Sequence, residues 1–132
     1  MHHDLIKSID RMEEEIRKIR LALFGRENDR PDLMEVIAKA EEVFGIRLRA
    51  NQNRHRKSVM GRATVAYIGR SLGYSDWYIG KILNRNRTTI LMLLNDDAFK
   101  VRYRNFPEFR EMAREVIVHF LPKEAEVWGN EG

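Results

Sequence analysis

The chain has 132 residues, of which 43% are hydrophobic and 33% charged. This size suits one compact domain with an appended helix and excludes a large multidomain enzyme. There is no cysteine, which excludes disulfides, thiolate zinc sites and cysteine nucleophiles together. The longest wholly apolar stretch, residues 90–94, falls far short of the roughly 20 residues that a membrane-spanning helix needs. We therefore expect a soluble, cytoplasmic protein that does not enter a membrane.

The charge is distributed unevenly along the chain. The formal net charge is +4, but residues 46–95 carry ten basic residues and one acidic residue. Seven of these basic residues lie within residues 47–70, where there is no Asp or Glu. Such a segment repels itself unless a polyanion lies nearby, so nucleic acid is the first candidate partner. A solvated basic surface is the alternative.

The first part of the chain carries a heptad pattern. Its apolar residues alternate between spacings of four and three: Leu5, Ile9, Met12, Ile16, Ile19 and Leu23. This pattern predicts a coiled-coil-like helix within residues 1–25, whose narrow apolar seam is suited to pairing. We expect a homodimer through residues 5–23. The alternative is that this helix packs on its own domain.

Two helices are predicted on either side of a basic segment. Residues 26–31 are polar, end in proline and read as a linker. A helix then begins near Asp32 and is terminated by Gly45. Residues 46–60 have no clear period, which predicts a basic loop or a short helix with a loop. Helical spacing resumes at Ala63 and stops at Gly73.

The next segment has the spacing of a helix-turn-helix. Ser75 can cap a short helix that ends at Leu83, for which the predicted inward residues are Trp77, Ile79, Ile82 and Leu83. Gly80 is small where two helices would cross closely, and Asn84 suits a turn that needs positive φ. Asn86 can cap the second helix through its side-chain oxygen.

The helix-turn-helix geometry assigns a role to the residues at its tip. Arg85, Arg87, Thr88 and Thr89 would project from the N-terminal end of the second helix. In such motifs, this end of the helix meets base edges in the major groove, and its exposed amides favour phosphate oxygens.

The remaining chain predicts one more helix and a tail. Residues 107–121 have helical apolar spacing and are stopped by Pro122. The aromatic and apolar residues that would seat the preceding chain are Phe99, Val101, Tyr103 and Phe106. We expect an all-α helix-turn-helix bundle of about five to six helices over residues 32–121, with the heptad helix in front and a flexible acidic tail, residues 122–132, behind.

Residues 33–94 share several motifs with a known DNA-binding family. The segments are Val43-Phe44-Gly45-Ile46, Arg54-His55-Arg56-Lys57-Ser58-Val59, Arg62, Val65-Ala66-Tyr67, Arg70, Ile79-Gly80 and Leu83-Asn84-Arg85-Asn86-Arg87-Thr88-Thr89-Ile90. In these segments the chain resembles the C-terminal DNA-binding domain of the bacterial chromosomal replication initiator DnaA, which has a Trp-repressor-like helix-turn-helix. The resemblance covers roughly half of the chain.

The resemblance implies contacts residue by residue. Asn86, Arg87 and Thr88 would face bases, and Thr89 would contact the backbone or a base methyl group. The basic residues that would reach phosphate or the adjacent minor groove are Arg54, Arg56 and Lys57, with Arg62 in the matching helix counted among the DNA-binding residues. The family usually has aspartate and histidine where this chain has Asn86 and Arg87. The resemblance therefore implies the fold and the docking mode, but not the family's usual DNA sequence.

Catalysis is not expected. The sequence contains no G-x-x-x-x-G-K-[ST] phosphate loop, so we expect no nucleotide. A nuclease commonly gathers carboxylates around a metal, yet the basic segment offers only Asp76, and Asp96 and Asp97 are adjacent. We expect no cofactor and no metal. The leading hypothesis is sequence-selective binding of double-stranded DNA in replication or transcription. The alternative is a protein–protein adaptor that uses the basic surface and the heptad helix without binding DNA.

Overall fold

The computed structural model describes residues 11–16, 18–19, 30–49 and 55–129. Within these ranges the chain is all-helical and contains no strand, as the sequence predicted. The helices after residue 30 are α2 (Leu33–Phe44), α3 (Arg56–Ser71), α4 (Asp76–Leu83), α5 (Arg87–Leu94), α6 (Ala98–Asn105), α7 (Arg110–Phe120) and α8 (Ala125–Gly129). Three short 3-10 turns, η2 (Asn95–Asp97), η3 (Pro107–Phe109) and η4 (Pro122–Glu124), join the last of them.

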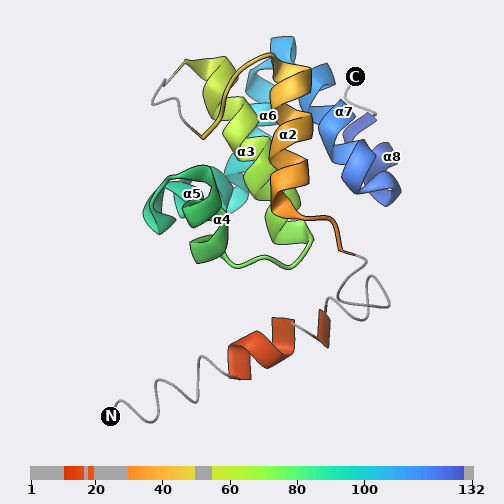
Figure 1. The fold of residues 1–132 in the computed structure, drawn as a ribbon. Helices are drawn as coiled ribbons and strands as arrows, with labels where there is room; N and C mark the ends of the chain where they lie inside the picture. The colour runs from red at the N-terminus through yellow and green to blue at the C-terminus, as the bar shows by residue number, and fades with distance from the viewer. Residues whose placement is uncertain (1–10, 17, 20–29, 50–54, 130–132) are drawn as a thin grey trace.

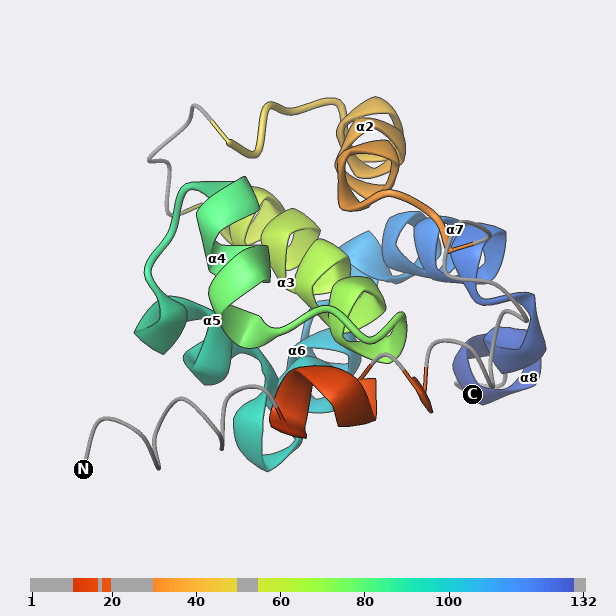
Figure 2. The same ribbon diagram turned by 60° about the horizontal axis from the view of Figure 1, so that its bottom comes forward.

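Helix α3 is the centre of the bundle. It contacts α2 and α7 on one side and α4 and α5 on the other, and α6 also packs against it (Figures 1 and 2). Because neighbours surround it, most of its circumference is buried, and its apolar residues do not form a single stripe. This arrangement puts α4 and α5 on the opposite side of α3 from α7 and α8 (Figure 2).

Helix α2 begins and ends where the sequence predicts. The side chain of Asp32 accepts a hydrogen bond from the amide of Met34 at 3.0 Å, which caps the first turn. Gly45 ends the helix in the left-handed region, with φ of 69°. The face between these caps is fully buried through Leu33, Val36, Ile37, Ala40 and Phe44.

Helix α3 begins two turns earlier than predicted. Its first residue is Arg56, with His55 at the N-cap, so residues 56–60 of the segment predicted as a basic loop, or a short helix with a loop, belong to α3. The missed turns pack through small residues, because a Cβ at Gly61 would lie 2.9 Å from Cδ2 of Leu48. Ser58 is also only 2% exposed. The first turns of α3 therefore have a buried face although their composition is polar.

The prediction of a flexible tail over residues 122–132 is wrong for residues 122–129, which form η4 and α8. Trp128 is only 4% exposed and packs against Tyr67 of α3 and against Phe99 and Tyr103 of α6 at ring distances of 4.7–5.3 Å. Glu124 accepts hydrogen bonds from the Trp128 indole, at 2.9 Å, and from the Tyr67 hydroxyl. This aromatic cluster closes the end of the core. Residues 130–132 lie outside the described ranges.

The segment before α7 is helical. Of the four residues predicted to pack it against the core, two are buried. Phe99 and Tyr103 are 2% exposed, whereas Val101 is exposed and Phe106 is half-buried. The reason is periodicity, because Phe99 and Tyr103 are four residues apart in α6 and share its inner face.

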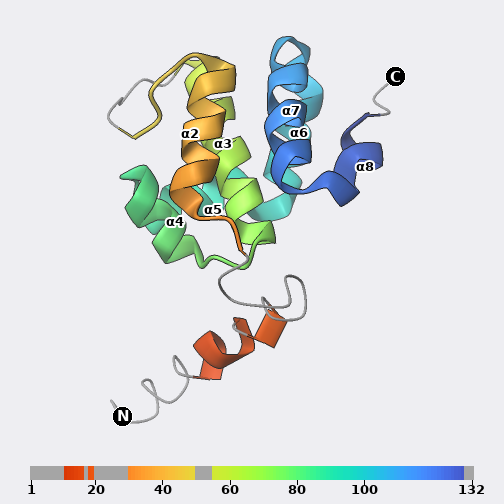
Figure 3. The same ribbon diagram turned by 45° about the vertical axis from the view of Figure 1, so that its right-hand side comes forward.

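The predicted N-terminal seam is only partly described. Residues 11–16 and 18–19 are helical, and Figure 3 shows residues 11–16 apart from α2–α8. Met12 and Ile19, one heptad apart, are exposed by 63% and 52%. Three residues at the two ends of the heptad pattern lie outside the described ranges: Leu5, Ile9 and Leu23. Residues 26–29 of the predicted linker lie outside them as well. Among the described helices, none combines the length and apolarity needed to cross a bilayer.

Candidate nucleic-acid interface

Helices α4 and α5 form a helix-turn-helix with a three-residue turn, residues 84–86. Ser75 caps α4 as predicted by accepting from the amide of Tyr78 at 3.1 Å. Asn84 has φ of 58°, the left-handed conformation that Asn tolerates better than most residues. Gly80 lies where α4 meets the turn, and a Cβ there would be 2.7 Å from the carbonyl oxygen of Arg85. A side chain at residue 80 would therefore open the turn.

The second helix is capped by Asn86. Its Oδ1 accepts from the amide of Thr89 at 2.8 Å and from the Thr89 hydroxyl at 2.9 Å. This cap leaves the two amide hydrogens of Asn86 available, because a carboxamide donates through its nitrogen and accepts through its oxygen. Ile79, Leu83 and Ile90 are fully buried and join the two helices to the core.

The tip of the helix-turn-helix is exposed. Asn86, Arg87 and Thr88 are exposed and Thr89 is half-buried, in line with the predicted projection. Arg85 differs, because it precedes the N-cap and lies within the turn. Its Nη1 donates to the carbonyl oxygen of Asn84 at 2.9 Å, so this side chain folds back on the turn instead of projecting from α5.

The structure places Arg62 inside the molecule, not on the predicted surface. This residue is 5% exposed, on the inner part of α3. Burial, followed by the positive charge of Arg85, lowers the pKa of Arg62. At this inward position the side chain is not presented to an external phosphate.

The remaining predicted basic residues have different surroundings. Arg56 is exposed, and its Nη1 lies 3.8 Å from Oε1 of Glu108, with its guanidinium 5.2 Å from the centre of the Phe106 ring. It therefore approaches the connection between α6 and α7. Lys57 is half-buried in the first turn of α3. Arg54 lies outside the described residues.

Arg49 connects the basic segment to the helix-turn-helix, although no role was predicted for it. Its Nε donates to the carbonyl oxygen of Ile82 at 2.7 Å, near the end of α4. The preceding residue, Leu48, is fully buried and anchors this part of the chain in the core. The acid-free run of residues 47–70 was the signal that could have indicated Arg49, but its contact partner is 33 residues away in the sequence.

The outer face of α4 carries Trp77 and Lys81. Trp77 was expected to face inward, but it is 62% exposed. Nζ of Lys81, one turn later, lies 5.1 Å from the centre of the indole ring. The only acid of residues 46–95, Asp76, pairs with Arg70 at 2.8 Å, so its negative charge is compensated locally. The surface around the turn thus has a positive character.

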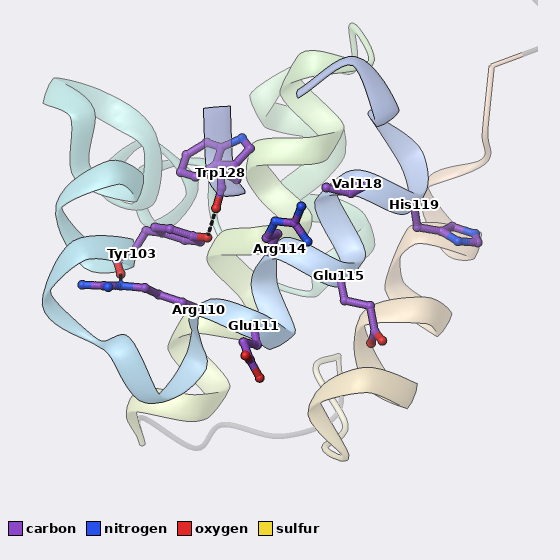
Figure 4. Close-up of a pocket in the computed structure, with 8 residues that line it drawn as sticks. All are labelled: Tyr103, Arg110, Glu111, Arg114, Glu115, Val118, His119 and Trp128. Carbon is purple, nitrogen blue, oxygen red and sulfur yellow. Dashed lines mark hydrogen bonds between the residues drawn. The ribbon is translucent and has the colours of Figure 1, made fainter. Parts of the chain in front are cut away.

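A concave feature lies on the other side of α3 from the helix-turn-helix (Figure 2). A cavity of about 700 Å³ opens between α6, α7 and α8 (Figure 4). Its lining combines Arg110 and Arg114 with Glu111 and Glu115, and so has no single charge. In the part of the chain that the structure describes, no group of three or more His, Asp or Glu side chains could hold a metal ion.

Comparison of the chain with protein-family models, with curated proteins and with solved structures gives no match. The candidate interface is therefore defined by its own residues: the exposed tip of α5, the turn that supports it and the basic residues beside it.

Proposed function

We propose that the protein is a sequence-selective double-stranded DNA-binding protein that inserts α5 into the major groove. The observation that carries this proposal is the exposed group of Asn86, Arg87 and Thr88 at the capped start of α5. A recognition helix of a helix-turn-helix presents its first residues to base edges in this way. The +9 net charge of residues 46–95 supplies the sequence-independent attraction to phosphate.

Each exposed group suits one kind of contact. The guanidinium of Arg87 can bind O6 and N7 of guanine through two hydrogen bonds, and the free amide hydrogens of Asn86 can donate to a base or a phosphate. Lys81 is on the first helix of the motif, which crosses the DNA backbone in such complexes, and is assigned to phosphate. Lys57 and Arg54 are assigned to the backbone or the minor groove. The resemblance of residues 33–94 to the initiator's DNA-binding domain supports the same docking mode.

The protein is further proposed to act as a homodimer in the cytoplasm, as a replication-associated factor or a transcriptional regulator. Met12 and Ile19 support pairing, because both are exposed at heptad spacing and have no cover from the described helices. Two-fold symmetry would make the DNA site an inverted or spaced repeat.

The test begins with selection of bound duplexes from a random pool, followed by gel-shift titration of the selected site. Arg87→Ala is expected to cost about 1–3 kcal/mol and to relax preference at one base pair, because it removes a bidentate contact. Lys57→Ala should weaken all duplexes alike and reduce the salt dependence by about one unit of slope. Arg114→Ala, which removes the same charge from the exposed face of α7, is the matched control and should leave binding unchanged. Unaltered binding and preference in Arg87→Ala would exclude base reading by α5.

The exposed Trp77 favours one second candidate, a protein–protein adaptor. Tryptophan is enriched at protein interfaces, and Trp77 is 62% exposed on the basic side of the molecule. An adaptor would dock this surface on an acidic protein and would not shift DNA at physiological salt. Gel-shift titration with mixed genomic DNA separates the two functions.

A further inference from the structure

Met92 occupies a position on α5 that the contacts proposed above do not use. It is 68% exposed, the largest exposure among the large hydrophobic residues of the described chain. It lies four residues after Thr88, so both side chains share one face of the helix. Ile90, Leu93 and Leu94 face the core on the other side, which leaves the Thr88–Met92 stripe directed away from the bundle.

The charges along α5 are polarised. Arg87 is exposed at its start and there is no acidic residue in its first turn, whereas Asp96 and Asp97 are exposed just after its end. A polyanion is attracted to the first end of the helix. The second end combines the two carboxylates with Arg102, whose Nη1 donates to the carbonyl oxygen of Leu93 at 3.5 Å. A duplex would therefore approach α5 from its N-terminal end. Met92, one turn after Thr88 on the same face, is the next side chain along that face that a base edge would meet.

The major groove offers one apolar group to such a side chain. Among the four bases, thymine alone presents a methyl group there, while the other edges present donors and acceptors. Methionine is long, flexible and polarisable, so it can cover a methyl group without a fixed geometry. A polar base edge under Met92 would lose water without gaining a hydrogen bond.

We propose, on the basis of the DNA-binding function proposed above, that Met92 is a specificity-determining residue that contacts a thymine methyl group. The rise between Thr88 and Met92 is about 6 Å along the helix axis, close to two base-pair steps. The preferred site should therefore contain a thymine about two base pairs from the pair under Thr88.

The test uses the full chain and the duplex selected from a random pool. Each thymine of that duplex is replaced singly with deoxyuridine, which removes only the C5 methyl group, and affinities are measured by gel-shift titration. At one position the replacement should weaken the wild-type protein about fourfold, as expected for one buried methyl group. Met92→Ala should bind the unmodified duplex more weakly and show no response to deoxyuridine at that position, while Met92→Leu should keep the response.

The controls distinguish this inference from the proposed function. Met34→Ala removes an exposed methionine from α2 and should behave as wild type toward both duplexes. A selected site without thymine, or equal deoxyuridine effects in wild type and Met92→Ala, overturns the role of Met92 while DNA binding stands. Failure to bind any duplex overturns both. Since Met92 is exposed, the circular dichroism of Met92→Ala should match that of the wild type.

Discussion

Gly80 and Arg85 are joined backbone to backbone across the turn of the helix-turn-helix. The amide of Arg85 donates to the carbonyl oxygen of Gly80 at 2.8 Å, and a Cβ at Gly80 would lie 2.7 Å from the carbonyl oxygen of Arg85. The turn can close to this distance only over a residue without a side chain. The direction in which α5 leaves the turn, and with it the position of Arg87, therefore depends on Gly80.

Gly80→Ala is expected to destabilise the protein although alanine is the better helix former. The helix preference of alanine should raise the free energy of unfolding by up to about 1 kcal/mol. The backbone shift that removes the clash with Arg85 should lower it by about 1–3 kcal/mol. We expect a net loss of about 1–2 kcal/mol in urea unfolding, together with weaker DNA binding as α5 is displaced. An increase in stability would show that the turn relaxes without strain.

Asn84 should respond to substitution according to backbone conformation alone. Its φ of 58° costs a residue with a Cβ about 1–2 kcal/mol, less for asparagine and least for glycine. Asn84→Ala should therefore lower the free energy of unfolding by about 1 kcal/mol, whereas Asn84→Gly should leave it unchanged or raise it. Thermal unfolding of the pair is the measurement, and equal effects of both substitutions would assign another role to the asparagine side chain.

Trp128 is expected to contribute strongly to stability. Trp128→Ala should lower the free energy of unfolding by about 3–5 kcal/mol, because it empties the aromatic cluster with Tyr67, Phe99 and Tyr103. Its neighbour Val127 is 59% exposed, so Val127→Ala is the matched control, with an effect within about 0.5 kcal/mol. Chemical denaturation measures both, and similar values would mean that α8 does not close the core.

Stability is expected to fall at high pH. Burial, then the hydrogen bond to Glu124, raises the pKa of Tyr67, and burial also raises the pKa of Tyr74. The folded state thus keeps phenolic protons that the unfolded chain releases above about pH 10, so the stabilising contribution is complete below that pH and is lost as the pH rises further.

Denaturation profiles from neutral pH to about pH 11 check this expectation. Tyr67→Phe should be less stable at neutral pH, because its hydrogen bond to Glu124 is missing, but its alkaline decline should be shallower. Tyr74→Phe should flatten the decline as well, with loss of its hydrogen bond to the carbonyl oxygen of Pro31. A parallel decline in wild type and Tyr67→Phe would remove Tyr67 as a source of the effect.

The helix-turn-helix could be predicted because its signals are local. Gly80, Asn84 and Asn86 act within a few residues of one another, so the sequence alone indicates their close approach, positive φ and capping. The same holds for Asp32 and Gly45 at the ends of α2. The exposure of Arg87 and Thr88 follows directly from these local features.

The misplaced features depend on contacts between distant parts of the chain. Arg62 is polar and stands in a basic run, and only the packing of α3 at the centre of the bundle shows that it is buried. Trp128 lies in an acidic stretch, and its aromatic partners are 25 to 61 residues earlier in the sequence. Composition favours a solvated segment in both cases, and tertiary packing decides otherwise.

The two indole rings of the protein occupy opposite environments, since Trp77 is 62% exposed and Trp128 is 4% exposed. Their fluorescence should therefore separate into a long-wavelength component, which iodide quenches, and a shielded component at shorter wavelength. One chain then reports two events without an added label: ligand docking beside the turn alters the first component, and opening of the aromatic cluster alters the second.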